Sequence, residues 1–288
     1  MESDRLFQPR SESELSAALS AEGRKVMIAG GTDLVMRFRK QDPGEIVLID
    51  LSRASFLRRT ARSEDGFWVG AGCTMTDLEG SPEVREAAAV LSRAAARVGS
   101  AQIRNLATIG GNVAGAAQCA DTLPALIALD ADAELLSASR GVRRMKVAEL
   151  VVGIGRTRLA DDEAITGFLI PVERVGLPGG FGKVGARKAV TIAKINGAGV
   201  FRLENGVIRE ARLAFGSLGE TAFLAETVSR SLVGRGIRDL SDDSLLEAFR
   251  RMVDEAIPTR ASLPYKRSAV RAVAAEILES IRVAGEGA

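Results

Sequence analysis

Two pairs of adjacent glycines form the pattern in this sequence that most resembles a binding site. Gly30–Gly31 stands in "VMIAGGTDL" and Gly110–Gly111 in "QIRNLATIGGNVAG", each within an apolar segment and beside threonine or asparagine. A glycine pair between a buried strand and a helix allows positive φ angles and the close approach of a ligand. The N–H groups that such a turn leaves free form a concave anion site. Two such turns facing each other would hold both phosphates of one pyrophosphate, which predicts a dinucleotide site.

Ordinary tight turns are the alternative interpretation of both glycine pairs. Neither segment matches the G-x-G-x-x-G dinucleotide fingerprint or the G-x-x-x-x-G-K-[ST] phosphate loop. Gly-Gly also occurs in turns that bind nothing, because glycine tolerates the positive φ angles that many turns require. The spacing of the residues therefore leaves both interpretations open.

Charged residues near the two pairs also allow more than one role. Asp33 would repel a phosphate, so we expect its carboxylate to turn away and cap the following helix. Arg104 and Lys183 are candidate counter-charges, although each residue taken alone is more typical of a solvated surface position. Asp121 begins an apolar helix, where it would be an N-cap or would contact a ribose or a flavin.

The residue types that are absent exclude several classes of enzyme. The chain has no histidine, which removes the usual general base and the commonest metal ligand. A Ser-His-Asp or Cys-His hydrolase is therefore excluded. The two cysteines, Cys73 and Cys119, lie too far apart in the sequence to ligate an iron–sulfur cluster or a structural zinc by themselves. If the chain is an enzyme, its chemistry belongs to a cofactor or to a partner chain.

Length and composition indicate a globular protein of one large domain or two ordinary ones. The 288 residues are 46% hydrophobic and 26% charged, with a formal net charge of +2. This balance gives no reason to expect a nucleic-acid or membrane partner. The sequence contains no apolar run long enough to span a bilayer, and "MESDRLFQPR" lacks the order of a signal peptide. We expect a cytoplasmic protein.

The predicted elements place the first glycine pair between a strand and a helix, and the second among helices. Periodicity and capping signals predict helices at 11–20, 33–40, 77–80, 81–98 and 121–131, and strands at 25–29, 45–50, 67–72, 133–139 and 163–171. A glycine-rich, irregular stretch at 173–188 suggests a domain boundary near residue 176. Beyond it, Asn205–Gly206 predicts a hairpin turn between 191–203 and 207–219. Three helices are expected at 220–234, 241–256 and 264–283, so the chain is of the α+β class.

These residues resemble those of a known family. "AGGTDL" together with "QIRNLATIGGN" is similar to the flavin-binding subunit of molybdenum hydroxylases, the group that includes xanthine dehydrogenase and carbon monoxide dehydrogenase. The resemblance covers nearly the whole chain, from "FQPRSESELSAAL" through "LPALIALDA" and "GFGKVGARKAVTIAKINGA" to "AFGSLGE" and "IPTRASLPYKRSAV". It implies a two-part FAD-binding region of the vanillyl-alcohol-oxidase-like type in residues 1–175. A small domain with a three-stranded antiparallel sheet and helices would follow in residues 176–288.

The resemblance also implies a set of FAD-binding residues. Two segments would surround the pyrophosphate, and three single residues would contact the flavin. The first segment comprises Met27, Ile28, Ala29, Gly30, Gly31, Thr32, Asp33 and Leu34; the second comprises Thr108, Ile109, Gly110, Gly111 and Asn112; the single residues are Asp121, Ile165 and Lys183. No catalytic side chain and no metal ligand is implied. The family usually carries Ser-Pro or Asp-Pro where this chain has Ala117–Gln118, so the local turn is expected to differ.

The implied function is electron transfer within a complex. In such complexes a molybdopterin subunit hydroxylates the substrate, an iron–sulfur subunit carries the electrons, and FAD on a chain like this one passes them to NAD⁺ or another acceptor. Without histidine, the FAD would be bound non-covalently. The assembly would be a dimer of heterotrimers, with its substrate and acceptor undetermined. A stand-alone FAD-dependent reductase and a non-catalytic assembly subunit are the alternatives, and the intact glycine pairs argue against the second.

Overall fold

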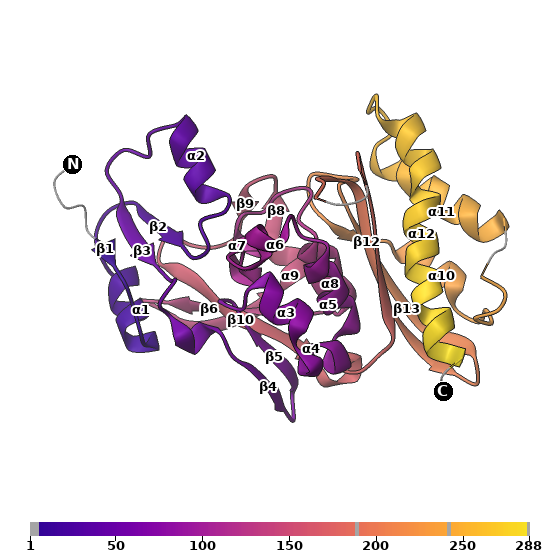
Figure 1. The fold of residues 1–288 in the computed structure, drawn as a ribbon, viewed down its shortest axis with the longest axis horizontal. Coiled ribbons are helices and arrows are strands. Elements are labelled where there is room, and N and C mark those ends of the chain that lie inside the picture. Colours follow the sequence, from indigo (N-terminus) through magenta and orange to yellow (C-terminus); the bar gives the residue numbers. More distant parts are fainter. Residues whose placement is uncertain (1–5, 188–189, 241–242, 287–288) are drawn as a thin grey trace.

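Layers of sheet and helix alternate along the molecule (Figure 1). The structure is a computed structural model that describes residues 6–187, 190–240 and 243–286. A five-stranded sheet packs against a group of short helices, and these helices pack against a four-stranded sheet. The longest helix covers the other face of the four-stranded sheet, and a three-stranded sheet lies at the N-terminal end. The main core fills the space between the two larger sheets.

The N-terminal sheet is parallel and has the order β1-β3-β2. Its elements are β1 (Leu6–Phe7), α1 (Glu12–Leu19), β2 (Lys25–Ile28), α2 (Leu34–Lys40) and β3 (Val47–Asp50). Ser11 caps α1, as the sequence predicts, because its side chain accepts a hydrogen bond from the Glu14 N–H. None of the residues of α2 is buried, so this helix lies on the surface beside the first glycine pair.

The central sheet is antiparallel, and β10 is its middle strand. Its strands are β4 (Thr60–Ser63), β5 (Gly66–Gly70), β6 (Asp132–Ser137), β7 (Gly141–Lys146) and β10 (Glu163–Pro171). The helices of this region are η1 (Ser55–Leu57), α3 (Met75–Gly80), α4 (Pro82–Ala87), α5 (Ala89–Ala96), α6 (Ala101–Arg104), α7 (Ile109–Ala114), α8 (Thr122–Ala128), α9 (Val147–Leu150) and η2 (Val172–Arg174), and a small hairpin adds β8 (Val151–Gly153) and β9 (Arg156–Thr157). Helices α5 and α8 contact both the core of this region and the C-terminal sheet.

The C-terminal region contains a sheet of order β11-β12-β13-β14 and three helices. Its elements are β11 (Gly179–Gly185), β12 (Ala193–Glu204), β13 (Val207–Gly216), β14 (Phe223–Leu224), α10 (Glu226–Leu232), α11 (Asp243–Ala256) and α12 (Leu263–Glu286). The predicted hairpin is confirmed: Asn205 and Gly206 connect β12 and β13 with φ values of 53° and 73°. The resemblance implied three strands, and the short strand β14 adds a fourth.

The glycine-rich stretch at 173–188 was expected to be irregular, and this expectation is wrong. Much of it forms β11, which packs directly under α12. A β-carbon on Gly180 would lie 2.4 Å from the Ile277 carbonyl oxygen, and one on Gly182 would lie 2.5 Å from that of Val273. Glycine is therefore required here because the helix backbone approaches the strand closely. The proposed domain boundary near residue 176 lies between η2 and β11 and stays a prediction.

Two predicted helices also differ from the structure. The helix expected at 81–98 is divided at Ala88, whose φ and ψ of −149° and 61° are not helical, into α4 and α5. Tertiary packing overrides the helix propensity of the alanine-rich run here. The segment expected to be helical from 220 begins instead with β14, because Phe223 and Leu224 pair with β13. The expected start of α11 at residues 241–242 lies outside the described residues.

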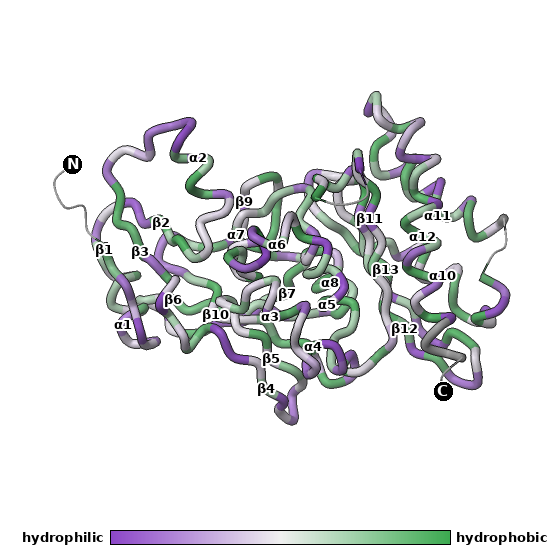
Figure 2. Tube along the Cα trace, viewed as in Figure 1, coloured by the Kyte–Doolittle hydropathy of each residue, from purple (hydrophilic) through white to green (hydrophobic). Residues whose placement is uncertain are grey.

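Hydrophilic residues are prominent on some surface segments of the fold. Figure 2 shows hydrophilic residues on the outer β4–β5 turn and on the C-terminal part of α2. Within residues 6–187, 190–240 and 243–286, no helix is both long and apolar enough to cross a membrane.

Candidate functional site

The first glycine pair lies in a loop whose backbone N–H groups are unused. The loop leaves β2 after Ile28 and reaches α2 at Leu34, and Gly31 has a φ of +65°. In the part of the chain that the structure describes, the N–H groups from Ala29 to Asp33 donate to no backbone or side-chain acceptor. Residues Ala29 to Thr32 are half-buried and Asp33 is exposed, so these N–H groups are open to solvent or to a ligand. A continuous run of unpaired donors is therefore suited to bind an anion.

The first loop is pressed against the segment that precedes the second glycine pair. A β-carbon on Gly30 would lie 1.8 Å from the carbonyl oxygen of Leu106 and 3.0 Å from the backbone nitrogen of Ala107. Only glycine allows this approach, because a methyl group would occupy the same space as the Leu106 backbone. The two glycine segments, distant in sequence, are therefore brought together in space.

The second glycine pair has a different role from the first. Gly110 and Gly111 lie in the first turn of α7, and their N–H groups are occupied. Gly110 donates to the Ala71 carbonyl at 2.9 Å, and Gly111 donates to Oγ1 of the N-cap residue Thr108 at 3.1 Å. The Ile109 N–H is also used, since it donates to the Cys73 carbonyl at 3.0 Å. The prediction that both glycine pairs form anion-binding turns is therefore wrong for the second pair, whose N–H groups are hydrogen-bonded within the protein.

Gly110 and Gly111 also differ in what surrounds them. A β-carbon on Gly110 would lie 2.7 Å from the Ala71 β-carbon, so this glycine allows α7 to pack on the end of β5. Gly111 is exposed, and a β-carbon there would meet only Thr108 Oγ1, at 3.0 Å. The backbone of Gly111 is therefore open to the recess, with no side chain in between.

A narrow, mostly apolar recess lies between the two glycine segments. It contains about 500 Å³ of empty space, part of which is open to solvent. Six of the predicted site residues line it, namely Met27, Ala29, Thr108, Gly110, Gly111 and Ile165. The rest of its lining is Leu51, Leu57, Ala71, Gly72, Ala114 and Leu159. Apolar walls next to free amide donors are typical of a site for a ligand with a ring system and an anionic group.

The prediction that Asp33 caps α2 through its side chain is wrong. Asp33 occupies the N-cap position, but its carboxylate makes no capping hydrogen bond. It forms an ion pair with Arg37 one turn later, at 2.7 Å, and its side chain is 68% exposed. Arg37 also donates to the Gly115 carbonyl at the end of α7, at 3.4 Å. The charge of Asp33 is therefore neutralised next to the free amides.

Asp121 and Lys183 form a buried pair outside the recess. Lys183 Nζ lies 2.5 Å from Asp121 Oδ2 and donates to the Arg97 carbonyl at 2.9 Å. Burial raises the pKa of the Asp121 carboxyl, although the adjacent Lys183 ammonium acts in the opposite direction. Asp121 occupies the N-cap position of α8 but makes no side-chain capping hydrogen bond, so the capping role considered for it is wrong. A contact with the ribose or the flavin stays a prediction. Arg104, the other expected counter-charge, is paired with Glu79 at 2.7 Å.

The pair is nevertheless connected with the recess through α7. Thr122, the residue after Asp121, donates from Oγ1 to Asn112 Oδ1 at 2.6 Å. Asn112 belongs to α7, whose residues Gly111 and Ala114 line the recess. The recess residues and the buried pair are therefore connected through α7 and the hydrogen bond from Thr122 to Asn112.

Sequence reasoning missed Asn196, which is the third member of the buried polar group. Its side chain is fully buried, and its Nδ2 donates to Asp121 Oδ1 at 2.8 Å and to the Ala120 carbonyl at 3.2 Å. One signal was present in the sequence, because asparagine is depleted in strands and this one lies in the middle of a predicted strand. Its partner was not predictable, since Asp121 lies 75 residues away in the sequence.

The Ala117–Gln118 departure is accommodated by contacts with the C-terminal domain. The Gln118 carbonyl accepts from the Ser217 N–H at 3.0 Å, and its Nε2 donates to the Gly219 carbonyl. Ala116, just before this segment, has a positive φ of 45°. The turn between α7 and α8 is therefore fixed by hydrogen bonds, in place of the proline that the family usually has there.

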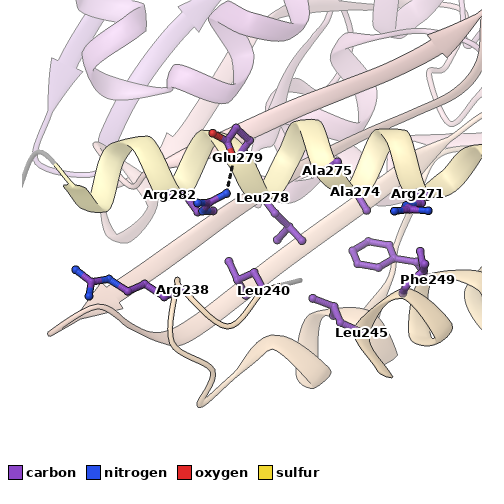
Figure 3. A pocket seen from close by; sticks show the side chains of 11 residues that line it. Arg238, Leu240, Leu245, Phe249, Arg271, Ala274, Ala275, Leu278, Glu279 and Arg282 are labelled. Atoms are coloured by element: carbon purple, nitrogen blue, oxygen red, sulfur yellow. Dashed lines mark hydrogen bonds and ion pairs between the residues drawn. The ribbon is translucent and has the colours of Figure 1, made fainter. Parts of the chain in front are cut away.

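A larger groove lies away from these residues, between α11 and α12 (Figure 3). Leu240, Phe249 and Leu278 project into it, and Arg238 and Arg271 stand at its margin. None of the predicted site residues lines this groove. The candidate site is therefore the recess between the glycine segments.

Family models match both parts of the chain. Residues 2–173 match the FAD binding domain in molybdopterin dehydrogenase, and residues 182–281 match the CO dehydrogenase flavoprotein C-terminal domain. The chain belongs to the family of FAD-binding subunits of molybdenum hydroxylases. It is an oxidoreductase subunit, and its cofactor is FAD.

Similar proteins extend over almost the whole subunit. The chain is 31% identical to the nicotinate dehydrogenase FAD-subunit of Eubacterium barkeri, over 86% of this chain and 84% of that protein. It is 28% identical to the xanthine dehydrogenase FAD-binding subunit of Escherichia coli O157:H7, over 90% and 89% of the two chains. Relatives at this level support a flavoprotein subunit of a dehydrogenase.

Solved structures show the same fold. A chain of quinoline 2-oxidoreductase from Pseudomonas putida 86 superposes with a TM-score of 0.81 at 25% identity, over 98% of this chain and 97% of that one. A chain of CO dehydrogenase from Oligotropha carboxidovorans gives a TM-score of 0.81 at 22% identity, over 95% and 98%. The arrangement of an FAD-binding domain followed by a C-terminal domain is therefore shared with these proteins.

Proposed function

We propose that this subunit carries FAD non-covalently and transfers electrons within a molybdenum hydroxylase complex. It accepts electrons from the iron–sulfur clusters of a partner subunit and passes them to NAD⁺ or another acceptor. The observation that carries this proposal is the run of unpaired N–H groups from Ala29 to Asp33, next to the apolar recess. Such donors match the charge of a pyrophosphate, and apolar walls match the rings at either end of a dinucleotide.

The residues of the chain bind and orient the cofactor. The amides from Ala29 to Asp33 donate to the pyrophosphate oxygens, and Gly111 allows the cofactor to approach the backbone of α7. Met27 and Ile165, which both line the recess, supply apolar contacts. Asp121 and Lys183 complete the site as flavin contacts, in keeping with the family resemblance.

The redox chemistry itself belongs to the cofactor. FAD, when bound, supplies the ability to take up and release one or two electrons. The chain has neither histidine for covalent flavin attachment nor a group of cysteines for an iron–sulfur cluster. An iron–sulfur subunit and a molybdopterin subunit are therefore the proposed partners, in a cytoplasmic dimer of heterotrimers.

The domain boundaries and the type of the FAD-binding domain belong to the same proposal. We propose that residues 1–175 form the two-part FAD-binding domain of the vanillyl-alcohol-oxidase-like type. Residues 176–288 then form the C-terminal domain. Sections of the chain on both sides of residue 176 contact each other extensively through α5, α8, β11 and β13, which supports a joint role in the site.

The absorption spectrum of the purified subunit tests the proposal. Flavin bands, with FAD released by heat, are expected. A colourless protein that cannot be reconstituted with FAD would contradict it and would favour the assembly subunit.

Purification from the native host separates the complex subunit from a stand-alone reductase. A complex subunit is expected to bring molybdenum and iron in fixed proportion to flavin. An isolated flavoprotein that reduces a small molecule by itself would favour the reductase.

A further inference from the structure

One row of residues across the C-terminal sheet faces Asp121. Lys183 of β11 is paired with Asn196 of β12, and Asn196 is paired with Gly216 of β13. Residues directly opposite one another in a sheet project to the same face. Lys183 Nζ lies 2.5 Å from Asp121 Oδ2, and Asn196 Nδ2 donates to Asp121 Oδ1 at 2.8 Å. Each oxygen of this carboxylate therefore has its own donor from the C-terminal sheet.

The third residue of the row makes room for Asn196. A β-carbon on Gly216 would lie 2.3 Å from Asn196 Oδ1, so any other residue would displace the amide. Asn196 Oδ1 itself has no hydrogen-bond partner within the described residues, although it is buried. Asparagine at this position therefore buries one unpaired oxygen, and its hydrogen bonds to Asp121 Oδ1 and to the Ala120 carbonyl offset that cost.

We propose that Asn196 is a positioning residue of the FAD site. With Lys183, it fixes the orientation in which the Asp121 carboxylate contacts the flavin, and it does not touch the cofactor itself. This inference rests on the proposed function, in which Asp121 is a flavin contact. It assigns to the C-terminal sheet a direct part in FAD binding, through Asp121 and the turn before α8.

A hydrogen-bonding variant and a matched control test this role. In Asn196→Leu the donor to Asp121 is lost while a side chain of similar size remains. We expect its Kd for FAD, measured by titrating the FAD-depleted full-length chain, to rise about tenfold. The control is Ser229→Ala, which removes a buried hydroxyl that accepts from the Leu213 N–H at 2.9 Å in the same domain. The control is expected to leave the Kd unchanged while lowering the midpoint of thermal unfolding.

A second variant adds a readout that loss of stability alone would not produce. Asn196→Asp places a second carboxylate against Asp121, and two adjacent carboxylates do not readily ionise together. The other titratable groups that face this position are Lys183, Arg97 and the Cys119 thiol. As the pH falls from about 8 to about 5, one carboxyl takes up a proton and can donate to the other, so the Kd of this variant is expected to approach that of the parent protein.

The outcomes separate this inference from the proposed function. If the parent protein binds no FAD, both are overturned. If it binds FAD and Asn196→Leu binds it equally well, with only a lower unfolding midpoint, Asn196 has a purely structural role and the inference fails alone. Weaker binding by Asn196→Leu, an unchanged Ser229→Ala and recovery of Asn196→Asp at low pH together support it.

Discussion

Gly30 lies against the carbonyl group of Leu106, so closely that a β-carbon on Gly30 would stand 1.8 Å from the Leu106 oxygen. This contact joins the loop after β2 to the segment before α7. The first loop supplies free amide donors, and the second segment supplies one wall of the recess. The joining of these two segments therefore depends on the absence of a side chain at Gly30.

Gly30→Ala is expected to separate the two segments. Because the backbone of Leu106 cannot yield as a flexible side chain would, we expect a loss of about 1–3 kcal/mol of folding stability. FAD retention should fall strongly, since the loop that carries the free amides would move away from the recess. Gly80→Ala is the matched control, because no atom lies within 4 Å of a β-carbon at Gly80. Equal FAD content in both purified variants, measured by absorbance, would show that the contact is dispensable.

The two glycines of α7 are expected to respond differently to the same substitution. Gly110→Ala introduces a methyl group 2.7 Å from the Ala71 β-carbon and should destabilise the fold. Gly111→Ala meets only Thr108 Oγ1, and alanine in a helix is favoured over glycine by roughly 0.5–1 kcal/mol. It should therefore retain or gain stability and yet bind FAD more weakly. Thermal unfolding with and without added FAD distinguishes the two effects, and unchanged FAD binding in Gly111→Ala would remove this residue from the site.

Removing Lys183 should lower folding stability, because the buried Asp121 carboxylate would lose its counter-charge. Breaking a buried ion pair by deleting one partner typically costs about 3–5 kcal/mol, so Lys183→Met is expected to be strongly destabilised near neutral pH. Burial already raises the pKa of Asp121, and loss of the ammonium raises it further. A carboxyl whose pKa is higher in the folded state favours folding at low pH and loses that contribution as the pH rises through the folded pKa.

The difference in stability between Lys183→Met and the parent protein should therefore be smaller at low pH than at high pH. Denaturant unfolding across the pH range measures it. The double variant Lys183→Met with Asp121→Asn should recover part of the loss, because no buried charge remains. A difference that is constant with pH would mean that Asp121 is not the group responsible.

Local patterns in the sequence predicted the parts of the fold that depend on local interactions. Ser11 and Ser81, the first residues of two predicted helices, act as helix N-caps, and Asn205–Gly206 forms the hairpin turn, because capping and turn geometry are decided by adjacent residues. The break at Ala88 was not predictable in this way. Nothing in an alanine-rich run signals where packing will interrupt it.

The candidate site was predicted only in outline. Both glycine pairs were identified, but glycine permits close packing and ligand approach equally well, and the sequence does not say which applies. The structure assigns packing to Gly110 through Ala71 and free donors to the loop of Gly31. Asn196 was missed because its role arises from strand pairing with Lys183 and from a contact with Asp121, both set by long-range packing.

A fourth prediction concerns the acid stability of the FAD-binding domain. Glu163 is fully buried at the start of β10, where Arg143 donates to both of its oxygens, at 2.7 and 2.8 Å. These hydrogen bonds and the N–H of Ala160 hold the pKa of Glu163 below its ordinary value. Glu163→Gln should therefore lower stability near neutral pH by about 1.5–3 kcal/mol, the range for hydrogen bonds to a charged group.

The pH dependence follows from the direction of that shift. A carboxyl whose pKa is lowered on folding stabilises the protein above its unfolded pKa, about 4.3 for glutamate, and loses this contribution as the pH falls through the folded pKa. The unfolding midpoints of Glu163→Gln and the parent protein should therefore converge as the pH falls below about 4. Glu45→Gln, at an exposed glutamate, is the control and should follow the parent protein throughout. Parallel curves for Glu163→Gln and the parent protein would show that the charge of Glu163 contributes nothing beyond its hydrogen bonds.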